Sequence, residues 1–180
     1  MGKEIIIVTI SLGNDGAERI LTELARQWHH DGHEITVIQT SPNRYGTEYA
    51  LPEGIEQIQI HTTSSNKILR FLQEIKALIG ILKQRPNATC LSFLSASSFI
   101  LAISSWFVKN RMVFSERNNP RKVPVGKHQQ ILRNFAFRFA DAIVFQTEDA
   151  KSYFSKSIQS RGHIIPNPIN GNLPEPYEGE

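Results

Sequence analysis

The 180-residue sequence predicts an α/β fold in which a parallel sheet of about six or seven strands carries helices on both faces. Short β-branched and apolar runs alternate along the chain with longer segments in which apolar residues recur every three or four positions. The loops between these segments are mostly short, as expected where crossover helices join parallel strands. The opening unit of strand, glycine turn and helix is typical of nucleotide-binding sheets.

The first third of the chain predicts three strands and one helix. Residues 4–10 read EIIIVTI and lead through SLGNDG into a helix that begins near Ala17 and ends at Asp31-Gly32. A second strand follows over residues 33–40. The third, residues 55–60, alternates strictly between apolar and polar side chains, so we expect it at an edge of the sheet.

A longer helix comes next, capped by Ser64, Ser65 or Asn66 and ended by Pro86. Residues 88–93 form an apolar strand, which we expect near the centre of the sheet. A helix of small residues then extends from Ser95 to about Val108. It places Trp106, like Trp28 earlier, at a helical core position.

The last third repeats the pattern. A strand at residues 111–115 runs into ERNNPRKVP, and a basic helix follows at 129–139. Residues 141–146 form a sixth strand, after which Thr147 caps a helix of about a dozen residues. A short strand at residues 163–165 completes the predicted sheet.

Composition excludes several classes of protein. The chain is 40% hydrophobic and 21% charged, as in ordinary globular domains. The single cysteine, Cys90, rules out an internal disulfide and fits a reducing, cytoplasmic compartment. The most apolar segment, residues 91–108, is interrupted by serines and does not read as a membrane span. A net charge of only +3 argues against a nucleic-acid-binding role.

The turn after the first strand is a candidate phosphate site formed by Gly13, Asn14 and Gly16. Glycines allow a ligand to approach the main chain, and the first amides of a helix favour an anion by about 0.3–1 kcal/mol. The spacing is Gly-x-x-Gly and not the dinucleotide Gly-x-Gly-x-x-Gly. A turn that serves only packing therefore remains an alternative.

A second candidate site is SERNNP, in which Ser115, Glu116, Arg117, Asn118 and Asn119 follow an apolar strand. Polar groups clustered at a strand end are costly unless a ligand or a hydrogen-bond network satisfies them. The alternative is structural: Glu116 and Arg117 form an ion pair and Asn118 caps a turn.

A basic cluster then includes Arg121, Lys122, Lys127 and Arg133, interleaved with aliphatic and aromatic residues. Such a segment binds phosphate, pyrophosphate or anionic lipid. The alternative is a solvated helix face whose aromatic side belongs to the core.

Metal and hydrolase chemistry have weaker signals. His29, His30 and His33 lie at a helix end without cysteine or acidic partners at metal-ligand spacing, so we expect no metal site. The serines between residues 92 and 98 lack a Gly-x-Ser-x-Gly elbow.

Four segments in order resemble the N-terminal domain of a GT-B glycosyltransferase of the large retaining family 4. They are SLGNDGAERIL (residues 11–21), SERNNP (115–120), FRFADAIVFQTEDAKSYF (137–154) and IIPNPI (164–169). The most similar subgroup comprises bacterial enzymes that build cell-surface polysaccharides or lipid-linked glycans.

The resemblance implies a Rossmann-like, acceptor-side domain over residues 1–168, the start of an interdomain linker at 169–180, and a C-terminal donor domain that this chain lacks. The fragment alone would then turn over little or not at all. The donor would be a nucleotide sugar, UDP- or GDP-linked, used without metal or other cofactor. The acceptor would be a glycan or a lipid-linked glycan, with possible contact to the inner face of the cell membrane.

The resemblance also assigns residues. Gly13, Asn14 and Gly16 would contact the donor phosphates or sugar, and Glu116 would act in catalysis by orienting sugar hydroxyls. The neighbouring cleft would be lined by Ser115, Arg117, Asn118 and Asn119. The anionic acceptor or the membrane would contact the basic residues Arg121, Lys122, Lys127 and Arg133. The hinge to the second domain would lie at Asn167 and Pro168. Many family members carry a cleft histidine where this chain has Ser115-Glu116, so no catalytic histidine is carried over.

Two other functions stay open. A non-catalytic subunit of a split glycosyltransferase, which binds a membrane or acceptor, would also explain the basic-aromatic segment. A nicotinamide- or methyl-donor-dependent enzyme is disfavoured, because Gln39 and Thr40 stand where an acidic residue would bind ribose.

Overall fold

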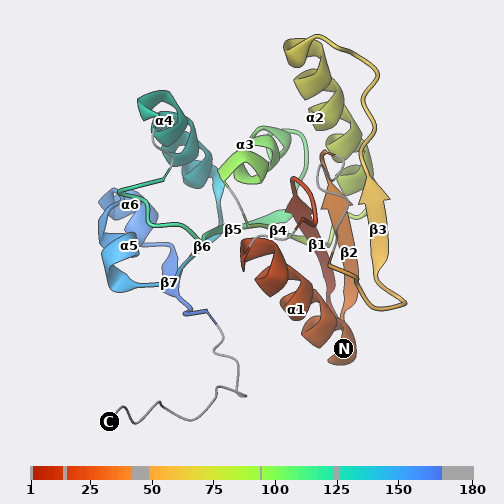
Figure 1. The fold of residues 1–180 in the computed structure, drawn as a ribbon, viewed down its shortest axis with the longest axis horizontal. Helices are drawn as coiled ribbons and strands as arrows, with labels where there is room; N and C mark the ends of the chain where they lie inside the picture. Colours follow the sequence, from red (N-terminus) through yellow and green to blue (C-terminus); the bar gives the residue numbers. More distant parts are fainter. Residues whose placement is uncertain (1, 14–15, 42–48, 94, 124–125, 168–180) are drawn as a thin grey trace, which may run out of the picture.

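Seven parallel strands form one sheet in the computed structural model, which describes residues 2–13, 16–41, 49–93, 95–123 and 126–167 (Figure 1). The strands lie in the order β3-β2-β1-β4-β5-β6-β7. The chain starts near the middle of the sheet, moves outward through β2 and β3, and then crosses back to place β4 beside β1. Doubly wound sheets open a crevice at such a reversal.

The predicted α/β class and strand number are confirmed. The strands are β1 (Glu4–Thr9), β2 (Glu34–Gln39), β3 (Glu56–Gln59), β4 (Thr89–Ser92), β5 (Arg111–Glu116), β6 (Ala142–Phe145) and β7 (Gly162–Ile164). The helices are α1 (Gly16–His30), α2 (Lys67–Gln84), α3 (Ser95–Ser104), α4 (Lys127–Ala136), the 3-10 turn η1 (Phe137–Phe139), α5 (Glu148–Ser152) and α6 (Lys156–Gln159).

Strand positions follow their side-chain patterns. The alternating strand β3 lies at one edge of the sheet, as predicted, and pairs only with β2 among the described strands. The apolar strand β4 lies at the centre between β1 and β5. Its Cys90 is fully buried, and burial raises the pKa of this thiol to about 12, so Cys90 is a small core residue.

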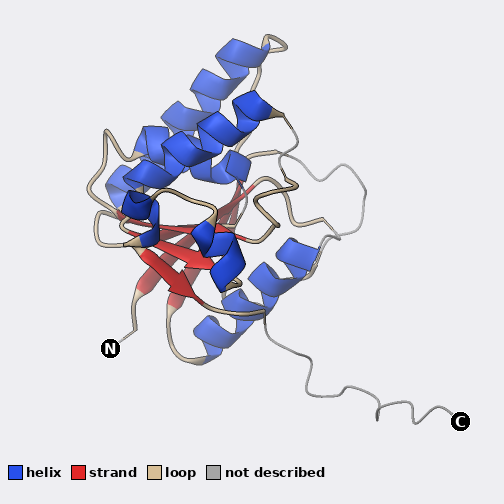
Figure 2. Ribbon diagram, turned by 90° about the vertical axis from the view of Figure 1, so that its left-hand side faces the viewer, coloured by secondary structure: helices blue, strands red, loops and turns tan. Residues whose placement is uncertain are grey.

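The two faces of the sheet are covered unequally (Figures 1 and 2). On one face, the α1 face, α1 packs over β1 and β2 and forms a small core with residues of β4 and the loops. On the other, the helix-rich face, α2, α3, α4 and the shorter helices contribute to a larger core. Over β5 and β6 the α1 face is open, and Val113 and Val144 are only partly buried there.

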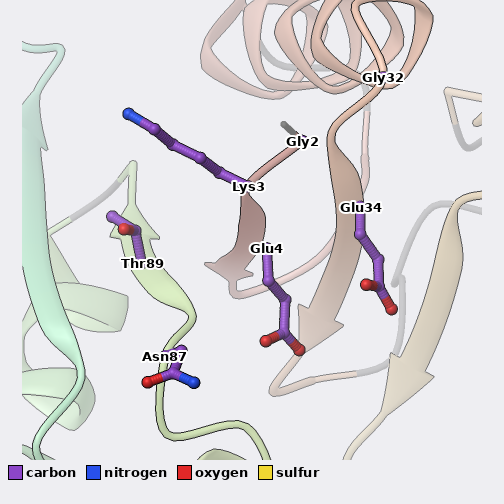
Figure 3. A pocket seen from close by; sticks show the side chains of 7 residues that line it. All are labelled: Gly2, Lys3, Glu4, Gly32, Glu34, Asn87 and Thr89. Carbon is purple, nitrogen blue, oxygen red and sulfur yellow. The ribbon is translucent and has the colours of Figure 1, made fainter.

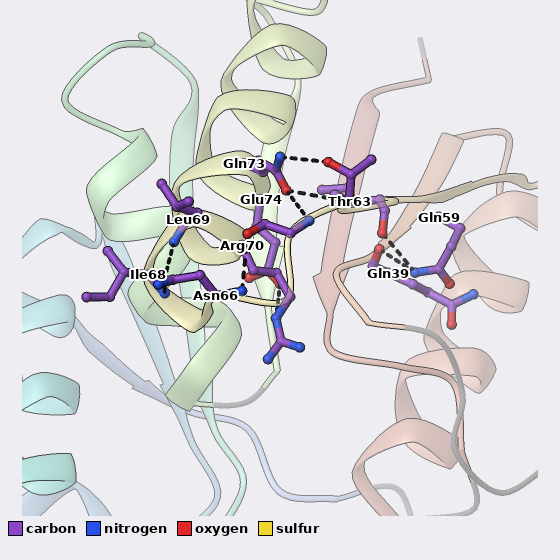
Figure 4. Close-up of polar contacts among 11 residues, drawn as sticks. Gln39, Gln59, Thr63, Asn66, Ile68, Leu69, Arg70, Gln73 and Glu74 are labelled. Atoms are coloured by element: carbon purple, nitrogen blue, oxygen red, sulfur yellow. Dashed lines mark hydrogen bonds and ion pairs between the residues drawn. The ribbon is translucent and has the colours of Figure 1, made fainter.

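Two of the predicted helix caps are observed. Asn66, one of three candidates, caps α2 by accepting hydrogen bonds from the backbone amides of Ile68 and Leu69 at 2.9 and 3.2 Å (Figure 4). Thr147 caps α5 by accepting from the amide of Ala150. Both caps satisfy amides that the first helical turn leaves without partners.

Two predictions about helices were wrong. The dozen-residue helix after Thr147 is divided into α5 and α6, because Phe154 turns into the core and Ser155 takes an extended conformation that begins a new helix. The predicted helix over 95–108 ends at Ser104. Trp106 beyond it is 60% exposed and packs edge-on against Phe139, so it is not a core residue.

Candidate functional site

All seven strands are parallel, so their carboxyl ends share one edge of the sheet. Two sequence-predicted segments meet that edge: the turn between β1 and α1, and the loop after β5 at residues 117–123, here called the β5 loop. They lie on opposite sides of the reversal between β1 and β4. The topology therefore places both segments where ligands bind in open α/β sheets.

The β1–α1 turn is held by side chains around it. The Leu12 amide donates to Gln39 Oε1 at 3.2 Å, and the Ser11 hydroxyl donates to Glu18 Oε1 at 3.1 Å. Glu18 is 5% exposed and lies in the first turn of α1, so the protein keeps a carboxylate of its own beside this helix end.

The predicted phosphate-binding residues are placed differently from one another. Gly13 is buried, whereas Gly16 is exposed as the first residue of α1, and a Cβ built on Gly16 meets no described residue outside its own helix turn within 4 Å. Asn14 lies outside the described residues. Space for a ligand exists at Gly16, and the donor-binding role of these residues stays a prediction.

Consecutive residues at the end of β5 face opposite sides of the sheet. Ser115 and Arg117 line a groove on the α1 face, whereas Glu116 lies among buried groups on the helix-rich face. The strand pairs with β6 through Glu116, so its alternation continues to that residue. SERNNP therefore does not present all its polar groups to one cleft.

The groove encloses about 610 Å³ and runs along the open part of the α1 face. Its floor is mainly apolar, with Ile5, Leu91, Val113 and Val144 contributed by four strands. At its carboxyl end lie Phe93, Ser115, Arg117, Ile165 and Pro166. Neither Gly16 nor Glu116 is among the described residues that line it.

Arg117 is the cation at the carboxyl end of this groove. Its guanidinium lies 5.3 Å from the centre of the Phe93 ring and donates to Asn167 Oδ1. Gln146 donates to the same Asn167 oxygen and to the Arg117 carbonyl, each at 3.1 Å. Partial burial lowers the pKa of Arg117. The predicted hinge residue Asn167 thus contacts the predicted cleft residue directly; Pro168 lies outside the described residues.

Glu116 is 3% exposed, so in this structure its carboxylate does not reach a ligand in the groove. Its Oε1 accepts from the Asn118 amide at 3.1 Å, and its Oε2 lies 3.5 Å from the Arg133 guanidinium without forming a hydrogen bond. Burial raises the pKa of Glu116 to about 7, against the opposing effect of these partners. The catalytic role expected for Glu116 stays a prediction; in this structure the strand directs the side chain beneath the loop and away from the groove.

Arg133 also differs from its prediction as a membrane contact. It is 1% exposed, and its guanidinium lies over the rings of Phe154 and Tyr153 at 4.9 and 5.2 Å. Its Nη1 donates to the Val123 carbonyl at 2.8 Å. A side chain enclosed by protein in this way does not meet a bilayer.

The remaining predicted site residues are at the surface. Asn118 and Asn119 are exposed on the β5 loop. Arg121, Lys122 and Lys127 are also exposed, and Arg121 pairs with Asp149 at 3.1 Å. The structure thus brings Ser115 and Arg117 to the groove, leaves the asparagines on the loop, and buries Arg133 while Arg121, Lys122 and Lys127 stay exposed.

The orientation of α4 differs most from what the sequence pattern predicts. Ile131 is 67% exposed, Leu132 43% and Phe135 37%, whereas Arg133 and Ala136 of the same helix are buried. The helix is rotated so that an arginine faces the core and aliphatic side chains face solvent. Spacing of Arg133 three residues before Ala136 and four before Phe137, both small or aromatic core residues, was the signal available in the sequence.

A second hollow lies at the opposite, amino edge of the sheet (Figure 3). It is lined by Lys3, Glu4, Glu34, Asn87 and Thr89 with two glycines. None of the predicted site residues that the structure describes lines it. It lies at the amino ends of the strands, whereas the candidate site lies at their carboxyl ends. Within the described ranges, no three His, Cys, Asp or Glu side chains come together as a metal site. Nor does any helix of these ranges have the length and hydrophobicity that a membrane crossing requires.

Several solved structures share the fold, and some of them are named as glycosyltransferases. HepE from Anabaena, solved in complex with UDP and glucose, aligns with a TM-score of 0.73 and 14% identity, covering 93% of this chain and 45% of HepE. The lipopolysaccharide outer core galactosyltransferase WaaB aligns with a TM-score of 0.71 and 12% identity, covering 93% of this chain and 46% of WaaB. A sucrose-phosphate synthase from Thermosynechococcus elongatus aligns with a TM-score of 0.70 and 6% identity, covering 91% of this chain and 48% of the synthase.

The chain therefore spans slightly less than half the length of these proteins. No curated protein matches the sequence. The family model for Glycosyltransferase Family 4 matches residues 14–172, which is most of the chain and includes the β5 loop. The chain belongs to glycosyltransferase family 4 and has the fold of a GT-B domain.

Proposed function

We propose that this chain is the N-terminal, acceptor-side half of a glycosyltransferase that transfers a sugar from a UDP- or GDP-sugar to a glycan or lipid-linked acceptor in cell-surface polysaccharide synthesis. The observation that carries the proposal is the carboxyl edge of the sheet, where an open helix N-terminus at Gly16 and the half-buried cation Arg117 flank the strand reversal. HepE, a structural neighbour, has been solved with UDP and with UDP-glucose.

In the proposed mechanism, the leaving diphosphate gains negative charge as the glycosidic bond breaks. Helix amides at Gly16 and the Arg117 guanidinium are fixed groups that stabilise such charge without a metal. Phe93 and Asn167 hold the Arg117 side chain in place, so little reorganisation is needed when the charge develops. The acceptor hydroxyl would attack from the side of the β5 loop, where Asn118 and Asn119 are exposed.

In this proposal the enzyme also has a donor domain, which contacts the open part of the α1 face. Parallel sheets are normally covered on both faces, yet the α1 face is open over β5 and β6. The chain leaves β7 at Ile165 and Pro166, which themselves line the carboxyl end of that groove. We propose that a segment of the downstream half packs there, burying Val113 and Val144.

Calorimetry tests the proposed donor. Intact protein, joined to its downstream half, is titrated with UDP-glucose, GDP-mannose and, as a control, ATP. We expect saturable binding of one nucleotide sugar and its nucleotide, and none of ATP. Absence of binding to every nucleotide sugar tried would overturn the proposal.

We also propose that α4 attaches the enzyme to the inner face of the cytoplasmic membrane, where a lipid-linked acceptor would be found. Ile131, Leu132 and Phe135 are exposed on this helix, and no acidic residue occurs between residues 121 and 140. Lys122 and Lys127 beside them are exposed cations. Apolar insertion together with attraction to anionic lipid is the usual basis of peripheral binding.

Vesicle sedimentation distinguishes this attachment from a solvated helix. We expect the protein to bind vesicles that contain phosphatidylglycerol and to remain partly bound in high salt, because the apolar contact is not screened. A non-catalytic membrane subunit, the second candidate function, would bind the vesicles but fail the calorimetric test. Equal recovery with and without vesicles would contradict the attachment.

A further inference from the structure

Arg133 is the side chain through which α4 reaches the β5 loop. Its Nη1 donates to the Val123 carbonyl at 2.8 Å and lies 3.5 Å from both the Pro120 carbonyl and Glu116 Oε2. The guanidinium is enclosed between the loop and the Phe154 ring. One buried group therefore joins the end of β5, two points along the loop and the helical layer.

Glu116 holds the beginning of the same loop. Its Oε1 accepts from the amide of Asn118, which turns the chain immediately after the strand. Asn119 continues the turn, since its side chain accepts from the Arg121 amide at 3.0 Å and its carbonyl from the Val123 amide at 2.9 Å. The loop is thus folded on local hydrogen bonds and fixed to the domain at both ends by Glu116 and Arg133.

We propose that Arg133 and Glu116 are positioning residues, which fix the β5 loop so that Arg117, Asn118 and Asn119 face the cleft at the carboxyl edge. For the reaction this rests on the proposed function; for the loop it rests on geometry alone. Both side chains are nearly inaccessible, so they act through the loop and not on a ligand.

Lysine is the informative replacement for Arg133. A guanidinium can donate to separate carbonyls in a fixed planar arrangement, whereas an ammonium is a compact point charge. Arg133→Lys keeps a positive charge, but its ammonium ends one bond short of the Nη1 position that contacts the Pro120 and Val123 carbonyls, and it removes the planar group over the Phe154 ring. Arg161 offers a matched control, because its Nη1 also donates to two carbonyls, those of Arg138 and Ala140, at the amino edge of the sheet.

Hydrogen exchange on the full-length protein tests the loop. We expect the amides of Asn118, Asn119 and residues 121–123 to exchange roughly tenfold faster in Arg133→Lys than in wild type, with β1 and β4 amides unchanged. Arg161→Lys is expected to leave the loop amides at the wild-type rate. Equal loop exchange in the two variants would overturn the positioning role.

Turnover separates this inference from the proposed function. With whichever of UDP-glucose or GDP-mannose the wild-type protein turns over, we expect Arg133→Lys to lower kcat about tenfold while nucleotide affinity by calorimetry changes less than about twofold. Glu116→Gln keeps an acceptor for the Asn118 amide and should restore most of the rate lost in Glu116→Ala. A wild-type protein that uses no nucleotide sugar would refute the proposed function, and the exchange comparison would still decide the role of the loop anchors.

Discussion

The two faces of the sheet differ in what they enclose. We therefore expect substitutions on the closed face to affect mainly stability and those on the open face to affect mainly ligand binding and turnover. The helix-rich face is closed and contains the buried Glu116–Arg133 pair. The α1 face is open over β5 and β6 and presents Ser115 and Arg117 to a groove. Because side chains alternate along β5, adjacent residues of one motif have different surroundings: Glu116 is buried beside Arg133, and Arg117 lines the groove.

The largest expected effect is on the closed face. Arg133→Met should lower the free energy of unfolding by about 3–5 kcal/mol, because it leaves a buried carboxylate and the Val123 carbonyl without their cationic partner. Urea denaturation followed by circular dichroism measures the change. Loss below about 1 kcal/mol would show that the pair contributes little to folding.

The raised pKa of Glu116, on the same face, should make the free energy of unfolding depend on pH. Its pKa is about 7 in the folded protein and near 4.5 when unfolded, so the folded state binds the proton more tightly. Its contribution to stability is therefore fully present below pH 4.5 and is lost as the pH rises through 7, a change on the order of 3 kcal/mol.

Glu116→Gln supplies the reference for this titration. The difference in unfolding free energy between wild type and variant should change with pH across that window and level off above it. A difference that stays constant from acid to neutral pH would mean that the carboxylate is not held in an apolar environment.

Substitution of Arg117, on the open face, should have a small effect on stability and a large effect on turnover. Arg117→Met is expected to cost about 1 kcal/mol or less in stability, because the side chain is only partly buried and loses one hydrogen bond and a ring contact. Turnover of the nucleotide sugar should fall more than tenfold, since a charge-assisted contact is worth about 1.5–3 kcal/mol. A stability loss as large as that of Arg133→Met would remove the contrast between the faces.

The smallest effect on folding is expected at the surface of α4. Ile131→Ser should change stability by less than about 0.5 kcal/mol, because its side chain is mostly exposed. Phe135→Ser should cost about 1 kcal/mol, because the ring is partly buried and packs edge-on against Phe139. Together they should weaken sedimentation with phosphatidylglycerol vesicles. Gln129→Ser, at an exposed polar position of the same helix, controls for helix propensity. Unchanged vesicle binding in the double variant would exclude α4 as the membrane contact.

Sequence periodicity was sufficient for the fold. The apolar runs of β1, β4 and β6 and the amphipathic pattern of α1 agree with the burial observed, because these elements pack against a parallel sheet in the ordinary way. In α2 the agreement covers only the second half, since Ile68, Leu69 and Leu72 at its start are exposed. The break between α5 and α6 escaped prediction, since it depends on Phe154 packing against Phe137 and Phe145 from other elements.

The site was less accessible to sequence reasoning. Side chains alternate between the two faces along a strand, so extending β5 beyond Phe114 places Glu116 and Arg117 on opposite faces. This separation could therefore be predicted from the sequence alone. The burial of Arg133 had one signal, its spacing from Ala136 and Phe137, but the hydrophobic spacing on α4 opposes that signal by favouring burial of Ile131 and Phe135. Tertiary contacts with Val123 and Phe154 override that spacing.

The central claim is that the turn after β1 opens onto a phosphorylated sugar, and Gly16→Val in the full-length protein tests it most directly. Gly80→Val in α2 is the matched control, because a Cβ at either glycine meets no other part of the described chain within 4 Å and both are exposed helical positions. We expect both variants to have the same unfolding free energy within about 0.5 kcal/mol, while only Gly16→Val loses nucleotide-sugar binding and turnover. Equal binding and turnover in the two variants would contradict the account.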